Sequence, residues 1–162
     1  MNILTKPLEE TTDFGKIVDL LKKKKTVSLS GCVDSQKINM LEALSDGFKY
    51  KIIATYSDIR VREIVDDLKM YERNVYAYPA KDLIFYQADI HNNKLVVERL
   101  KALKRIAEGA AVTLVTTYDS LMTPVLPIRI FKDNCIDIKK ASTIDIKAIS
   151  KKLVEIGYIR NY

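Results

Sequence analysis

The sequence predicts a three-layer α/β fold with a parallel sheet over residues 1–127, followed by the start of a small α+β domain over residues 128–162. Short β-branched runs alternate with amphipathic helical segments, and this alternation is typical of parallel sheets with right-handed crossovers. The 162 residues are 48% hydrophobic, with only 5 Gly and 4 Pro. A chain of this length and composition can bury one sizeable core and does not have the signature of disorder.

Four strands are expected in the first domain, at residues 26–30, 51–56, 75–78 and 111–117. The last is almost wholly apolar, as in a strand that is buried on both faces. Helices are predicted where apolar side chains recur at intervals of three and four residues, over 14–21, 38–48, 61–68 and 96–107. Asp58 is expected to cap the third helix and Gly109 to end the fourth. The fourth helix should bury Val96, Leu100, Leu103 and Ala107.

The second domain is expected after Pro124 and Pro127, which punctuate the chain. Alternating side chains predict a half-buried strand at 136–138, and apolar spacing predicts a helix at 146–156 that Gly157 closes. Residues 158–162 are strand-like but have no visible partner strand. We therefore expect the sequence to end inside this domain.

A phosphate-binding loop reads G-x-x-x-x-G-K-[ST] between a strand and a helix, and Gly31 and Lys37 occupy its first and seventh positions. The sixth position holds Gln36, whose side chain would obstruct the approach of main-chain N–H groups to phosphates. The eighth holds Ile38, which cannot ligate Mg²⁺. Chance spacing and a degenerate phosphate loop both explain the match. Under either explanation we expect no catalytic, cofactor-binding or metal-binding residue in this chain.

The net charge of +6 is concentrated near the C-terminus, where residues 129–162 hold 8 basic and 4 acidic residues. A basic segment can bind nucleic acid or an acidic partner, although lysines of this kind more often form a solvated face. These lysines are Lys139, Lys140, Lys147, Lys151 and Lys152. An aromatic cluster could stack bases, but without a basic stripe we favour packing. Its members are Tyr71, Tyr76, Tyr78, Phe85 and Tyr86.

The sequence does not indicate a metal site, a redox motif or a membrane span. The single histidine, His91, has no ligand-spaced cysteines or carboxylates near it. Cys32 and Cys135 form no C-x-x-C motif, so we expect reduced thiols in a cytoplasmic protein, with a disulfide as the alternative. No apolar run of about 18 residues is present that could span a membrane.

Four segments together resemble the N-terminal region of bacterial transcription-repair coupling factors. They are YPAKDLIFYQADIH at 78–91, VERLKAL at 97–103, VTTYDSL at 115–121 and LVEIGY at 153–158. The likeness runs in order from about Gly31 to Tyr158. Each motif is weak alone, and the combination is specific.

The resemblance implies a P-loop-NTPase-like fold, because the first domains of that family are similar to the B component of the excinuclease, which verifies DNA damage. It also implies that the loop at Gly31–Ile38 is degenerate and that an insert domain begins near Ile128. That insert binds the A component of the excinuclease, mostly through strands beyond Tyr162, so no contact residue can be assigned here.

For the whole protein the family implies displacement of stalled RNA polymerase and recruitment of nucleotide-excision repair. A helicase-like, ATP- and Mg-dependent DNA translocase lies elsewhere in the parent, and other domains contact RNA polymerase and DNA. We therefore expect a non-enzymatic fragment with no cofactor of its own and no membrane partner. The alternatives are an ATPase domain with a divergent P-loop, or a DNA-binding module that uses the basic C-terminal segment.

Overall fold

The computed structural model describes residues 3–11, 13–80, 93–140 and 143–160. The chain divides into two compact units, Met1–Pro124 and Val125–Tyr162.

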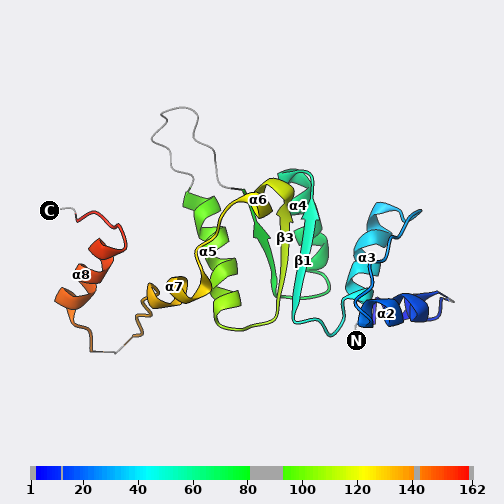
Figure 1. The fold of residues 1–162 in the computed structure, drawn as a ribbon, viewed down its shortest axis with the longest axis horizontal. Coiled ribbons are helices and arrows are strands. Elements are labelled where there is room, and N and C mark those ends of the chain that lie inside the picture. Colours follow the sequence, from blue (N-terminus) through cyan, green and yellow to red (C-terminus); the bar gives the residue numbers. More distant parts are fainter. Residues whose placement is uncertain (1–2, 12, 81–92, 141–142, 161–162) are drawn as a thin grey trace. The chain divides into compact units, whose positions relative to one another are not determined.

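The first unit contains a three-stranded parallel sheet in the order β1–β3–β2 (Figure 1). The strands are β1 (Tyr50–Thr55), β2 (Val75–Tyr78) and β3 (Val112–Thr117). The α/β class and the parallel sheet predicted from the sequence are confirmed, and so are three of the four expected strands. The central strand β3 is the most buried of them, as its apolar run predicted.

Two helices cover opposite faces of the sheet. Helix α4 (Asp58–Leu68) leads from β1 to β2, and α5 (Asn93–Ala107) leads from β2 back to β3. Because these connections cross the sheet in opposite directions, right-handed crossovers place the helices on opposite faces. The side chains agree: Val75 and Ala77 of β2 pack in the core with α4, whereas Tyr78 contacts Arg99 of α5.

The main core lies between α4, the sheet and α3 (Asp34–Leu44). Ile38 of α3 joins α4 residues spaced three and four apart, the interval that places side chains on one helix face. The buried members of this core are Ile38, Val61, Ile64, Val65, Leu68, Val75 and Val115. A shared core means that α3 and α4 lie on the same face of the sheet.

The predicted strand at 26–30 is wrong: these residues form no strand. They have strand-like side chains, but a strand needs a partner, and no described strand pairs with the outer edge of β1.

The predicted N-cap of helix α4 is also wrong, because the Ser57 hydroxyl, one residue before Asp58, accepts the Arg60 N–H at 3.2 Å. Helix α2 (Phe14–Lys22) is confirmed, whereas the short α1 (Lys6–Glu9) and α6 (Tyr118–Met122) were not expected.

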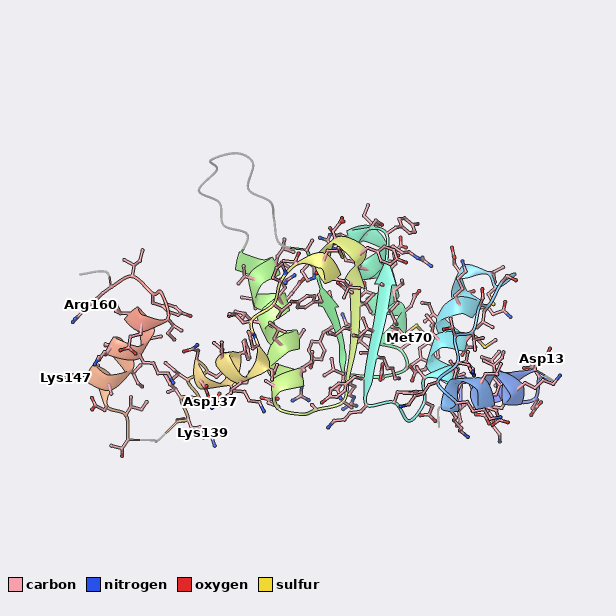
Figure 2. The ribbon with its side chains drawn as sticks, viewed as in Figure 1. Asp13, Met70, Asp137, Lys139, Lys147 and Arg160 are labelled. Carbon is pink, nitrogen blue, oxygen red and sulfur yellow. The ribbon has the colours of Figure 1, made fainter. Side chains whose placement is uncertain are left out.

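The second unit holds α7 (Ile128–Asp133) and α8 (Ile146–Glu155). Helix α8 confirms its prediction, and the Asp145 carboxylate caps it by accepting the Lys147 and Ala148 N–H groups at 2.9 and 3.1 Å. Figure 2 labels Lys147 on this helix. The strand expected at 136–138 is wrong, because nothing in the described part of this unit pairs with it. No residue of α7 or α8 is buried.

Candidate functional site

The residues of the suspected phosphate loop precede a helix, as expected. Gly31 has a φ of +81°, in the left-handed region that glycine adopts without strain. Helix α3 begins three residues later at Asp34, and its N-cap residue Val33 offers no side-chain hydrogen bond. The loop therefore reaches a helix N-terminus, the usual place for a bound phosphate.

That helix N-terminus already carries a negative charge from the chain itself. The Lys37 ammonium lies 2.9 Å from the Asp34 carboxylate, and the Arg60 guanidinium lies 3.5 Å from the same oxygen. The hydrogen bond from Lys37, followed by the charges of Lys37 and Arg60, lowers the pKa of Asp34. An ionised carboxylate in the first turn complements the helix dipole. It would also repel the phosphates of a nucleotide.

The other two positions of the loop are also unsuited to Mg·ATP. Ile38, where a phosphate loop has a hydroxyl, is only 3% exposed and packs in the core against α4. Gln36 is exposed on the first turns of α3. The structure thus brings Lys37 to Asp34 and turns Ile38 away from solvent. The absence of a cofactor stays a prediction.

A cavity of about 480 Å³ lies beside this loop, at the carboxyl end of β1. Ligands of α/β proteins bind at this end of the sheet. Its cations are already paired with carboxylates, because Arg60 also lies 2.8 Å from Glu63. The hydrogen bond from Arg60 to Glu63 is the largest contribution that raises the pKa of Arg60. Nothing in this geometry presents a free cation to an anionic ligand.

A buried arginine on α5 forms a second polar cluster that the sequence did not reveal. Arg99 is 7% exposed and donates to the Tyr78 hydroxyl at 2.7 Å and to the Ser120 hydroxyl at 3.0 Å. It also donates to the Pro79 carbonyl, and its guanidinium lies 4.0 Å from the centre of the Tyr78 ring. All the partners that the structure describes for Arg99 are neutral.

The Arg99 cluster joins the carboxyl ends of β2 and β3. The Ser120 hydroxyl donates to the Pro79 carbonyl at 3.0 Å, and the Thr116 hydroxyl donates to the Tyr78 carbonyl at 2.7 Å. The described polar groups of the cluster find their hydrogen-bond partners within the protein. The cluster therefore holds the carboxyl ends of β2 and β3 in a fixed position relative to each other. We assign it a structural role.

The buried face of α5 differs from the prediction. Ala107 is buried as predicted, but Val96 and Leu100 are exposed, and Arg99 and Ala102 are buried in their place. Apolar residues occur on two faces of this helix, so spacing alone could not select between them. The Arg99 cluster left no recognisable signal in the sequence, because Tyr78 and Ser120 are each 21 residues away from Arg99.

A partly buried ion network lies at the opposite end of the sheet. Lys51 of β1 contacts Glu42 of α3 at 3.2 Å and Glu72 at 3.4 Å, and the Thr113 hydroxyl donates to Glu72. Both carboxylates share one ammonium group. The network ties α3 to β1 and to the turn after α4.

The remaining candidates do not form a site. Of the aromatic cluster, Tyr78 packs on Arg99, whereas Phe85 and Tyr86 lie outside the described residues. The single histidine, His91, also lies outside them. Cys32 and Cys135 are free thiols. The described part of the chain contains no group of three or more metal-ligating side chains. Among the same residues, no helix is long and apolar enough to cross a membrane.

A further cavity, of about 950 Å³, lies along the outer side of β2 between α4 and α5. Its walls carry charges of both signs, including Arg62 and Lys69 as well as Asp66 and Glu98. A mixed wall of this kind does not favour one charge type of ligand.

No protein-family profile matches the chain, but curated proteins do. The chain is 25% identical to the transcription-repair-coupling factor of Bacillus subtilis over 158 residues, which cover 95% of this chain and 13% of the relative. The proteins of that name from Staphylococcus epidermidis and Staphylococcus aureus are 24% and 22% identical, over 83% and 99% of this chain. The chain spans only 12–14% of the length of these relatives. The predicted resemblance to coupling factors is confirmed.

Proposed function

We propose that this chain is the N-terminal, non-catalytic module of a transcription-repair coupling factor. The observation that carries the proposal is the match of nearly the whole chain to proteins of that name. In the parent protein we propose that an ATP-driven DNA translocase displaces stalled RNA polymerase and that excision-repair proteins are then recruited. The present module would hold the recruiting domain in position.

The geometry of the loop supports a non-catalytic role. The Lys37 ammonium is held by Asp34, and the residue that would bind Mg²⁺ through a hydroxyl is the buried Ile38. Mg·ATP hydrolysis requires a free lysine and a hydroxyl ligand for the metal. We therefore propose a P-loop-NTPase-like fold whose phosphate loop is degenerate.

The second unit supports the proposal of an insert domain. Helices α7 and α8 bury no residue, and Ile146 and Val154 of α8 are exposed. An amphipathic helix that buries no side chain lacks the packing that stabilises most helices in proteins. We propose that residues 128–162 begin the domain that binds the A component of the excinuclease.

The experiment is strand-specific repair in cells that express the parent protein as their only copy. Deletion of residues 1–162 should abolish the faster repair of transcribed strands, while Lys37→Ala should leave it unchanged. Lys69→Ala, which removes an exposed lysine outside the loop, is the matched control. Loss of coupling in Lys37→Ala but not in Lys69→Ala would contradict a non-catalytic loop.

DNA binding by the second unit is the alternative that the charge favours. Lys147 and Lys151 are exposed on α8. Duplex DNA affinity that falls steeply with salt and is reduced in Lys147→Ala would support this alternative. Binding that is weak and unaffected by that substitution would remove it.

A further inference from the structure

The outer edge of β2 has no partner strand among the residues that the structure describes, since β2 pairs there with β3 alone. The Thr113 N–H donates to the Asn74 carbonyl at 2.9 Å, so residue 74 faces β3. Alternate residues of a strand face opposite sides, and Tyr76 therefore also faces β3. The backbone N–H and C=O groups of Val75 and Ala77 point to the outer edge.

The β2 edge lacks the features that usually block strand addition. Proteins protect such edges with charged side chains or proline in the strand, or with a bulge. Strand β2 is Val75–Tyr78, with the sequence VYAY, and carries no charge. A cavity of about 950 Å³ lies along its outer side and is lined by Val75, Tyr76 and Ala77. The edge is therefore open to another strand.

Helix α4 lines this cavity with a row of exposed charges that alternate in sign. The row is Asp58, Arg62, Asp66 and Lys69, whose spacings of four, four and three residues place them on one helix face. Within one copy, Lys69 lies 3.3 Å from Asp66, and both side chains are more than half exposed. Reversal of the row turns each charge position into its opposite. A two-fold axis between two copies produces this reversal.

The centre of the row lies near the level of Tyr76. Helix α4 runs from the carboxyl end of β1 to the turn before β2, so its middle lies over the middle of the sheet. Tyr76 pairs near the middle of β3. A two-fold axis at Tyr76 then places Arg62 opposite Asp66 of the second copy. It also places Asp58 opposite Lys69 of the second copy.

The same axis gives a regular antiparallel pairing of the two β2 strands. Val75 would lie opposite Ala77 of the second copy, and each such pair would exchange both of its backbone hydrogen bonds. Tyr76 would lie opposite Tyr76 of the second copy, in the closer pair that makes no backbone hydrogen bond. Cross-strand aromatic pairs of this kind stabilise a sheet.

The charges of α5 do not oppose this arrangement. Arg99 of α5 contacts the hydroxyl of Tyr78, the last residue of β2. Lys94 and Glu98 line the cavity earlier on this helix, beyond the carboxyl end of β2. A two-fold axis at the level of Tyr76 places the two copies of these residues at opposite ends of the joined sheet.

We propose that the β2 edge is a self-association surface, on which a second copy of this chain adds its own β2 strand antiparallel to the first. The two sheets then form one continuous sheet with the two-fold axis at Tyr76. Walls of mixed charge, which favour no simple ion, fit a reversed copy of themselves. The proposal goes beyond the proposed function and does not depend on it.

Sedimentation equilibrium of the 162-residue chain and its charge-reversal variants tests the proposal. Arg62→Asp and Asp66→Arg each place like charges across the axis and should weaken the dimer about 10-fold or more. An equimolar mixture of the two variants should associate about as tightly as the wild type, because opposite charges then meet between the copies. Asp67→Arg, at an exposed residue that does not line the cavity, is the matched control and should change little.

Hydrogen–deuterium exchange of the wild type locates the interface. The Val75 and Ala77 amides should exchange more slowly as the protein concentration rises. The Ile52 amide should not change, because the Val112 N–H donates to the Lys49 carbonyl at 3.0 Å and Ile52 therefore faces the outer edge of β1.

Three results would overturn the proposal. The first is a wild-type chain that remains monomeric at about 1 mM. The second is a mixture of the two charge-reversal variants that associates no better than either variant alone, because the charges would then act only within one copy. The third is protection of Ile52 in place of Val75 and Ala77, because the copies would then meet at the β1 edge.

Discussion

Substitution of Arg99 tests how the carboxyl end of the sheet is held together. Arg99→Ala removes three hydrogen bonds and the contact with the Tyr78 ring. Buried acceptors that lose a charged donor cost about 1–3 kcal/mol each, and a desolvated cation–π contact is worth about 2 kcal/mol. The Pro79 carbonyl keeps the Ser120 hydroxyl as a donor. Because such terms do not add fully, we expect a loss of about 3–5 kcal/mol in the free energy of unfolding.

The assay is urea denaturation of the 162-residue chain, with the shift in midpoint at constant m converted to free energy. If Arg99→Ala does not fold, Arg99→Lys gives the measurement, with an expected loss of about 1–3 kcal/mol because lysine lacks the planar fork. Arg105→Ala, at a half-exposed arginine paired with Glu108, is the matched control and should cost about 0–1 kcal/mol. A loss below about 1 kcal/mol for Arg99→Ala would refute the structural role of the cluster.

Three further predictions concern single contacts. Lys51→Met should destabilise the chain by about 2–4 kcal/mol in urea denaturation, because Glu42 and Glu72 would lose their shared cation; a change under about 0.5 kcal/mol would contradict the network. The pKa of Asp34 is lower in the folded state, so its stabilising contribution is present above the unfolded pKa and is lost as pH falls through the folded pKa. Asp34→Asn should therefore lose less stability than the wild type as pH falls below about 4, and equal losses would be evidence against the contact with Lys37. Ser57→Ala should cost about 1 kcal/mol through the lost cap of α4; a larger loss in Asp58→Ala would restore Asp58 as the cap.

The elements that sequence predicts well are those whose determinants are local. Residues 111–117 form an apolar β-branched run, and the strand is found at Val112–Thr117. Gly109 and Gly157 have φ values of +73° and +100°, as expected of glycines that end helices. In these cases the residue itself, or its neighbours within one turn, decides the conformation.

The elements that failed depend on distant partners. Residues 26–30 have the side chains of a strand, but pairing requires a neighbour that is not supplied by the described chain. The buried face of α5 was misassigned because Arg99 is buried by Tyr78 and Ser120, which are each 21 residues away in the sequence. For the loop, sequence identified the altered positions Gln36 and Ile38, but only the structure shows that Lys37 is paired with Asp34.

Equilibrium titration of the 162-residue chain with a fluorescent ATP analogue and Mg²⁺ tests most directly whether this loop has lost its nucleotide. With a carboxylate at the start of α3 and Ile38 in the core, we predict no saturable binding in the micromolar range. Micromolar binding that requires Mg²⁺ and disappears in Lys37→Ala would contradict the account.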